Sequence, residues 1–134
     1  MHTAEHLLNQ TMVRLFGIDR CFSAHIEKKK SKCDYKFNRA LTEAEIKNIE
    51  DKINEIIQAN LPVTFEIMPA VEAKKIFGAR APEGENDVRI VKIGDYDAIP
   101  CIGAHVKLTK ELGQFRIISS DFNEGVLRIR YKLN

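Results

Sequence analysis

Two pairs of potential metal ligands, one at the beginning of the chain and one far downstream, place the strongest constraint on the fold. His2 and His6 stand four residues apart at the start of a stretch with the pattern of an amphipathic helix. Residues i and i+4 lie on the same face of a helix, so both imidazoles can turn toward one ion. Cys101 and His105 repeat the same spacing. We therefore expect the fold to bring these four side chains together around a metal.

Zinc is the ion that a mixed set of imidazole and thiolate ligands favours. A lone His-x-x-x-His pair is more often a helix cap or an ordinary histidine. The second pair makes metal binding the better interpretation, because Gly103 lets the backbone turn two ligands inward. Four protein ligands would close a tetrahedral zinc ion, whereas three would leave a position for water. The sequence leaves both arrangements open. His2 directly follows the first residue, so it is the ligand that water would most readily replace.

Composition limits the class of protein. The 134 residues can bury a real core, and a hydrophobic content of 44% with 30% charged residues is ordinary for a globular domain. We expect one domain over residues 1–134, without a membrane span or a signal peptide. Three cysteines without paired spacing favour a reducing compartment, hence the cytoplasm. The net charge of +2 neither requires nor excludes a nucleic-acid partner.

The hydrophobic pattern predicts an α+β protein with helices packed on one face of a mostly antiparallel sheet. In that arrangement the histidine-bearing helix faces the loop that holds the cysteine. Thr42 and Glu45 form a capping box at the start of one helix. Helices are expected at residues 3–16, 43–60 and 69–77, strands at 21–27, 32–37, 63–68, 88–93, 96–99, 114–119 and 126–132, and the main loop at 79–86.

The sequence resembles one known family. Residues 2–8, His-Thr-Ala-Glu-His-Leu-Leu, resemble the His-Thr-Ala-x-His-Leu-Leu motif of the alanyl-tRNA synthetase editing domain and its free-standing relatives. This family is related to the second additional domain of threonyl- and alanyl-tRNA synthetases. Residues 101–105, Cys-Ile-Gly-Ala-His, stand where the family has Cys-Gly-Gly-Thr-His. Further stretches resemble the family in order and spacing, at residues 41–46, 60–63, 88–94, 113–117 and 125–129.

The resemblance implies a zinc-dependent deacylase that acts in trans on mischarged tRNA. Its expected substrate is the ester that joins serine or glycine to the terminal ribose of tRNA(Ala), so the expected partner is a tRNA acceptor end. Zinc would polarise the carbonyl group or activate the attacking water. Carried over from the family, the ligand roles fall to His2, His6, Cys101 and His105.

Four further residues are candidates around the metal. Glu5 is a candidate to contact the water or the substrate amino group, and the alternative is a solvent-facing carboxylate. Ser23 and His25 lie about where the family has a glutamine-containing strand that lines the pocket, so either is a candidate to read the substrate or relay a proton. A plain strand histidine is the alternative for His25. Asp97 is a candidate to orient a ligand imidazole.

Two basic clusters are candidates for contact with tRNA phosphates. The first surrounds a predicted turn and consists of Lys28, Lys29, Lys30 and Lys32. The second alternates with apolar residues in the last strand and consists of Arg128, Arg130 and Lys132. The alternative for a lysine-rich turn is a solvated surface.

Other functions stay open from the sequence. Residues 2–6 also match the His-x-x-Glu-His signature of inverted zinc peptidases, with Glu5 as the general base. Those enzymes take a distant carboxylate as the third ligand, which fits this chain less well. Ile102 and Ala104 replace a glycine and a threonine of the editing family, so the amino-acid preference is in question. Compared with the family pattern, we also expect this chain to lack the family's extra β-barrel domain and the residues that normally precede the first histidine. A zinc-containing module that binds tRNA or another partner without hydrolysis, or a metal-dependent hydrolase of another substrate, is the alternative.

Overall fold

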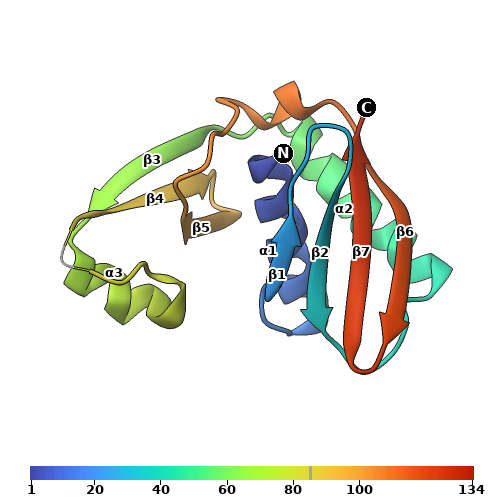
Figure 1. Cartoon of the computed structure of the whole chain (residues 1–134). Coiled ribbons are helices and arrows are strands. Elements are labelled where there is room, and N and C mark those ends of the chain that lie inside the picture. Colours follow the sequence, from blue (N-terminus) through green and yellow to red (C-terminus); the bar gives the residue numbers. More distant parts are fainter. Residues whose placement is uncertain (85) are drawn as a thin grey trace.

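The computed structural model describes residues 1–84 and 86–134. The chain order alternates helices with short runs of strands (Figure 1). The elements are α1 (His2–Phe16), β1 (Ser23–His25), β2 (Ser31–Lys36), α2 (Glu43–Gln58), β3 (Val63–Met68), α3 (Ala70–Phe77), η1 (Gly78–Arg80), β4 (Val88–Ile93), β5 (Asp97–Pro100), η2 (Thr109–Leu112), β6 (Phe115–Asn123) and β7 (Val126–Leu133).

The strands form two antiparallel sheets. One has four strands in the order β1-β2-β7-β6, and the other has three in the order β3-β4-β5. The predicted α+β class and antiparallel pairing are therefore confirmed, but the expectation of one sheet is not. The reason lies in α1, which is buried around most of its circumference. It packs against the four-stranded sheet with one side and contacts β5 with the other, so it separates the two sheets (Figure 1).

The main core lies around α1 and α2. Leu7, Leu8 and Met12 of α1 are fully buried. Residues from both sheets belong to the same cluster, among them Tyr35 from β2 and Val91 from β4. A smaller cluster, in which Ala73 of α3 packs with Val88 and Ile90 of β4, lies at the outer end of the three-stranded sheet. None of the described helices is long and apolar enough to cross a membrane.

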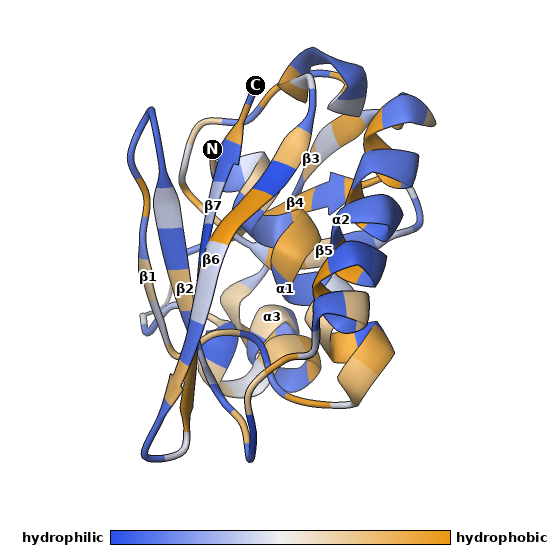
Figure 2. Cartoon of the chain, turned by 90° about the vertical axis from the view of Figure 1, so that its right-hand side faces the viewer, coloured by the Kyte–Doolittle hydropathy of each residue, from blue (hydrophilic) through white to orange (hydrophobic). Residues whose placement is uncertain are grey.

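Local sequence rules account for α2. Its N-terminus has the predicted capping box, in which Glu45 N donates to Thr42 Oγ1 at 3.1 Å and Thr42 N donates to Glu45 Oε1 at 2.9 Å. Ile49, Ile53 and Ile57 are fully buried and lie on one face of the helix. Figure 2 shows hydrophobic and hydrophilic residues alternating around this helix and along β6. The amphipathic pattern therefore sets how α2 packs.

Strand lengths follow the pairing of each strand. β1 is an edge strand with only three paired residues, shorter than the expected 21–27. β6 continues to Asn123, beyond the expected 114–119, because it forms a long hairpin with β7. The tip of this hairpin is Glu124-Gly125, and both residues have a positive φ. The expected loop at 79–86 begins with η1 and includes residue 85, which lies outside the described residues.

Candidate metal centre

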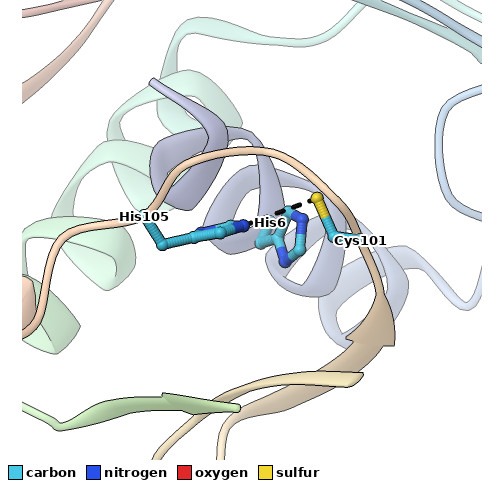
Figure 3. A group of neighbouring side chains, drawn as sticks. All are labelled: His6, Cys101 and His105. Atoms are coloured by element: carbon cyan, nitrogen blue, oxygen red, sulfur yellow. Dashed lines mark hydrogen bonds between the residues drawn. The ribbon is translucent and has the colours of Figure 1, made fainter. Parts of the chain in front are cut away.

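Three of the four predicted ligands lie together in the structure. His6 projects from α1, while Cys101 and His105 come from the loop that follows β5 (Figure 3). One donor atom from each of the three lies within 4.8 Å of the other two. This loop, residues 101–105, is called the ligand loop below. The fold therefore joins the first turns of α1 to a loop far away in the sequence, as the spacing of the two motifs predicts.

The ligand loop is tied down at both ends. Arg89 of β4 donates from Nε to the carbonyl oxygen of Cys101 at 2.7 Å and from Nη2 to that of Gly103 at 2.6 Å. Beyond the loop, Lys107 accepts a hydrogen bond from the amide of Val63 at 2.8 Å. The sequence analysis did not identify Arg89 as part of the site. Arg89 lies in a strand before the cysteine motif, and the sequence does not show that its side chain contacts the ligand loop.

The Cys101 sulfur has two polar neighbours. The amide of Gly103 donates to Sγ at 3.3 Å, and His105 Nε2 lies 3.4 Å from the same atom. Gly103 also lies against His2, because a Cβ atom there would be 2.6 Å from His2 Nδ1. A glycine is therefore needed where the loop passes this histidine.

Thr3 contacts the ring nitrogen of His105 that faces away from Cys101. Its Oγ1 lies 2.9 Å from His105 Nδ1 and accepts a hydrogen bond from the amide of Val106 at 3.3 Å. When Nδ1 carries the ring proton and donates it to Thr3, Nε2 keeps a free lone pair toward Cys101. Thr3 is only 1% exposed, so water does not compete for this contact. Sequence reasoning missed Thr3, although its i, i+3 spacing from His6 places it on the same helix face.

His6 has a free nitrogen in a buried position. Among the described residues, no group forms a hydrogen bond with His6 Nδ1, and the nearest carboxylate oxygen, Asp97 Oδ2, is 3.6 Å away. Arg20 holds Asp97 with two hydrogen bonds of 2.8 and 3.2 Å. Burial raises the pKa of Asp97, and the positive charge of Arg20 opposes that shift. Asp97 thus lies beside the imidazole of a candidate ligand, but its orienting role stays a prediction.

Both imidazoles of the group are held in the neutral form. Burial, followed by the charges of His105 and Arg20, lowers the pKa of His6 from 6.5 to about 3. Burial, followed by the charges of His2 and Arg89, lowers the pKa of His105 to about 4. Neutral imidazole is the form that binds metals. Two neutral imidazoles and one cysteine sulfur, with one donor atom each, form a set that fits a zinc ion.

His2 lies beside this group without joining it. Its ring centroid is 6.0 Å from that of His105, and it is not among the residues whose donor atoms lie close together. Its predicted role as a fourth ligand stays a prediction.

The predicted catalytic candidates lie in different surroundings. Glu5 is partly buried and accepts a hydrogen bond from Asn9 Nδ2 at 2.9 Å, and burial raises the pKa of its carboxyl group. Ser23 and His25 are exposed on the edge strand β1. His25 Nε2 lies 2.8 Å from Glu27 Oε1 at the surface. The structure does not place either β1 residue in the metal-ligand group, and the catalytic roles of all three candidates stay predictions.

The predicted basic clusters differ in how much of their charge is neutralised. Lys28, Lys29 and Lys30 are exposed between β1 and β2. Three of the remaining cations pair with carboxylates of the four-stranded sheet: Lys32 and Arg128 with Asp34, and Arg130 with Asp121. As predicted, β7 alternates between a buried apolar side and a charged side, which also carries Lys132. The turn lysines are therefore the stronger candidates for phosphate contacts.

Comparisons with known proteins agree with the sequence resemblance. Residues 88–130 match the threonyl and alanyl tRNA synthetase second additional domain, and this region includes Cys101 and His105. An alanine–tRNA ligase from Treponema denticola is 41% identical over 140 residues, which cover 96% of this chain and 22% of the ligase. The alanine–tRNA ligase of Bacillus subtilis is 37% identical over 134 residues, and that of Staphylothermus marinus is 33% identical over 137 residues. These two alignments cover 96% and 97% of this chain but 15% of each ligase.

The chain therefore spans a small part of the length of these curated relatives. The matches nevertheless cover 96–97% of this chain. The family resemblance is confirmed: nearly the whole chain is similar to one segment of alanine–tRNA ligases, and its residues 88–130 match the second additional domain of threonyl and alanyl tRNA synthetases.

Proposed function

We propose that this chain hydrolyses the ester bond between tRNA(Ala) and a wrongly attached serine or glycine. It acts in trans in the cytoplasm, as one domain with a bound zinc ion. The observation that carries the proposal is the grouping of His6, Cys101 and His105 in a chain related to alanine–tRNA ligases. Bound zinc would supply Lewis-acid polarisation of the ester carbonyl and activation of water. An aminoacyl ester is already activated, so a strong side-chain nucleophile is not needed.

The proposed reaction is the hydrolysis of an ester by water. Water adds to the ester carbonyl carbon, the bond to the ribose oxygen breaks, and that oxygen takes up a proton. The products are the free amino acid and uncharged tRNA. We propose that Glu5, directly before His6, contacts the substrate amino group or the attacking water. Ser23 and His25 are the proposed contacts from β1, and Asp97 is proposed to orient the His6 ring.

We propose that tRNA phosphates lie against the exposed lysines between β1 and β2, with weaker contributions from the paired cations. Phosphate contacts of this kind position a nucleic acid without reading its sequence. The proposed contact residues are Lys28, Lys29, Lys30, Lys32, Arg128 and Arg130.

A second function deserves a test because of His2. Its ring lies close to His105 and against Gly103, so a small movement could bring it to the ion as a fourth ligand. Four protein ligands would leave no position for water or substrate. The chain would then be a zinc-containing module that binds tRNA without hydrolysing it.

The proposed hydrolysis can be tested with purified protein of measured zinc content. Ser-tRNA(Ala), Gly-tRNA(Ala) and Ala-tRNA(Ala) are incubated with the wild type, with Cys101→Ala and with Lys47→Ala, a control on the exposed surface of α2. We expect the wild type and the control to deacylate the seryl and glycyl esters and to spare Ala-tRNA. Cys101→Ala should lose both zinc and activity, because it removes the only sulfur ligand of the group.

Loss of every ester at the same rate in the wild type and in Cys101→Ala would contradict the role of the metal centre. If the zinc-loaded wild type leaves every ester intact but binds tRNA, hydrolysis is wrong and the binding module is supported.

A further inference from the structure

An exposed aromatic ring lies beside the candidate metal centre. Phe65 of β3 is 52% exposed, and its ring centroid is 6.3 Å from that of the His105 ring. The guanidinium carbon of Arg89 lies 4.5 Å from the Phe65 centroid, over the ring. A flat apolar ring thus stands next to a candidate ligand, and a cation covers one of its faces.

Two further apolar side chains are exposed on the two segments that Arg89 contacts, β3 and the ligand loop. Ile67 lies two residues after Phe65, on the same face of β3, and is 64% exposed. Ile102 lies within the ligand loop and is 92% exposed. Arg89 connects the two, because it pairs with Ile67 in the sheet and donates to the carbonyl groups on either side of Ile102. Phe65 and Ile67, on one face of β3, are thus apolar side chains that the fold leaves available for binding.

We propose that Phe65, supported by Arg89, forms a platform on which the terminal adenine base of the tRNA stacks. This inference rests on the proposed function. In an aminoacyl-tRNA one ribose separates the terminal base from the ester. If the terminal base stacks on Phe65, the ester on the same nucleotide would therefore lie close to the candidate ligands, which include His105. Bases stack on aromatic side chains whatever their sequence, and a guanidinium over the ring adds a cation–π attraction.

Arg89 links the platform to the ligand loop. The same guanidinium that lies over Phe65 makes two hydrogen bonds to the ligand loop. The ring and the loop are therefore held relative to each other, and a stacked base would be positioned with respect to the metal ligands. Stacking on Phe65 would contribute to substrate binding, while the ligands of the centre act on the ester.

A fluorescence experiment tests the stacking without depending on hydrolysis. The chain contains no tryptophan, so Phe65→Trp places a single indole at the platform. Ile118→Trp on β6, at a position that is 47% exposed, is the matched control. The probes are two RNA hairpins with the acceptor stem of tRNA(Ala), one ending in CCA and one ending in CC.

We expect the CCA hairpin to quench Phe65→Trp in a saturable manner and the CC hairpin to quench it much less. Ile118→Trp should not distinguish the two hairpins. Equal responses of Phe65→Trp to both hairpins, or no response to either, would overturn the proposal.

The kinetics of Ser-tRNA(Ala) deacylation provide a second test of the platform. Phe65→Ala should raise KM on the order of tenfold, the typical effect of losing one stacked base, with kcat and zinc content little changed. Phe65→Trp should restore KM, and Ile118→Ala should match the wild type. If the wild type hydrolyses the ester but Phe65→Ala keeps its KM, the platform is wrong and the proposed function stands. If the wild type is inactive but the CCA hairpin still quenches Phe65→Trp, the platform stands and hydrolysis fails.

Discussion

The hydroxyl group of Thr3 decides which nitrogen of His105 is available to a metal. It accepts the amide hydrogen of Val106 and faces His105 Nδ1 at 2.9 Å inside the protein. Partners of this kind fix the tautomer and the orientation of a ligand imidazole. The residue has no contact with the ion in this account, so its effect is one of positioning.

Replacing this hydroxyl should weaken metal binding without unfolding the protein. We predict that Thr3→Val lowers zinc affinity roughly 10- to 100-fold, while Thr3→Ser, which keeps the oxygen, stays near the wild type. Competition with a chromophoric chelator measures the affinity, and circular dichroism checks the fold. Thr64→Val, an exposed substitution on β3, is the control. Wild-type zinc affinity in a folded Thr3→Val protein would show that the hydroxyl does not position the ligand.

The grouping of three candidate ligands could be predicted from sequence, whereas the residues that support them could not. His6, Cys101 and His105 have side chains with metal-binding chemistry and a regular spacing. Thr3 and Arg89 act through a hydroxyl group and a guanidinium that occur throughout proteins. Their roles depend on how the ligand loop approaches α1 and β4, and that approach is set by tertiary packing.

Strands β2 and β7 are joined by a charged pair as well as by their backbones. Asp34 lies opposite Arg128, whose Nε donates to Oδ1 at 2.8 Å, and Lys32 Nζ donates to Oδ2 at 2.9 Å. The hydrogen bond from Arg128, with further help from Lys32, holds the pKa of Asp34 below its usual value. The charged carboxylate therefore favours the folded state.

This pair predicts a pH-dependent contribution to stability. Because the folded pKa of Asp34 is depressed, its contribution is complete above the unfolded pKa of about 3.9 and is lost as the pH falls through the folded pKa. We expect Asp34→Asn to lower the free energy of unfolding by about 1 kcal/mol at neutral pH, a modest value because solvent screens the partly exposed Arg128. Urea unfolding from neutral pH down to about pH 2 should show the difference from wild type shrinking. The exposed Asp51→Asn is the control, and a pH-independent difference would contradict the account.

Element positions were more predictable than element partners. Residues 63–68 and 88–93 were expected as strands and have these bounds in the structure. Alternation of apolar residues shows that a segment is a strand, but it does not say which strand lies beside it. Nor does a strand prediction say which apolar residues stay exposed, and in β3 the structure leaves Phe65 and Ile67 exposed. The proposed platform residue, Phe65, is one of these exposed apolar residues.

At the scale of the whole molecule, α1 connects the core to the metal centre. The helix lies between the two sheets, with Leu7 and Leu8 fully buried and His6 directed at the ligand loop (Figures 1 and 3). The division into two sheets was not predictable, because the sequence of α1 shows that it is buried but not that strands cover it on opposite sides. Because α1 packs on the four-stranded sheet, its contact with the ligand loop connects that sheet to the three-stranded sheet, after which the loop begins.

The central claim is that His6, Cys101 and His105 hold one zinc ion, and X-ray absorption at the zinc edge tests it most directly. Protein reconstituted with one equivalent of zinc should show one sulfur neighbour at about 2.3 Å and at least two imidazole nitrogens at about 2.0–2.1 Å. A third imidazole would identify His2 as a ligand. Cys101→Ala should lose the sulfur shell. A wild-type spectrum without sulfur, or one that Cys101→Ala leaves unchanged, would contradict the account.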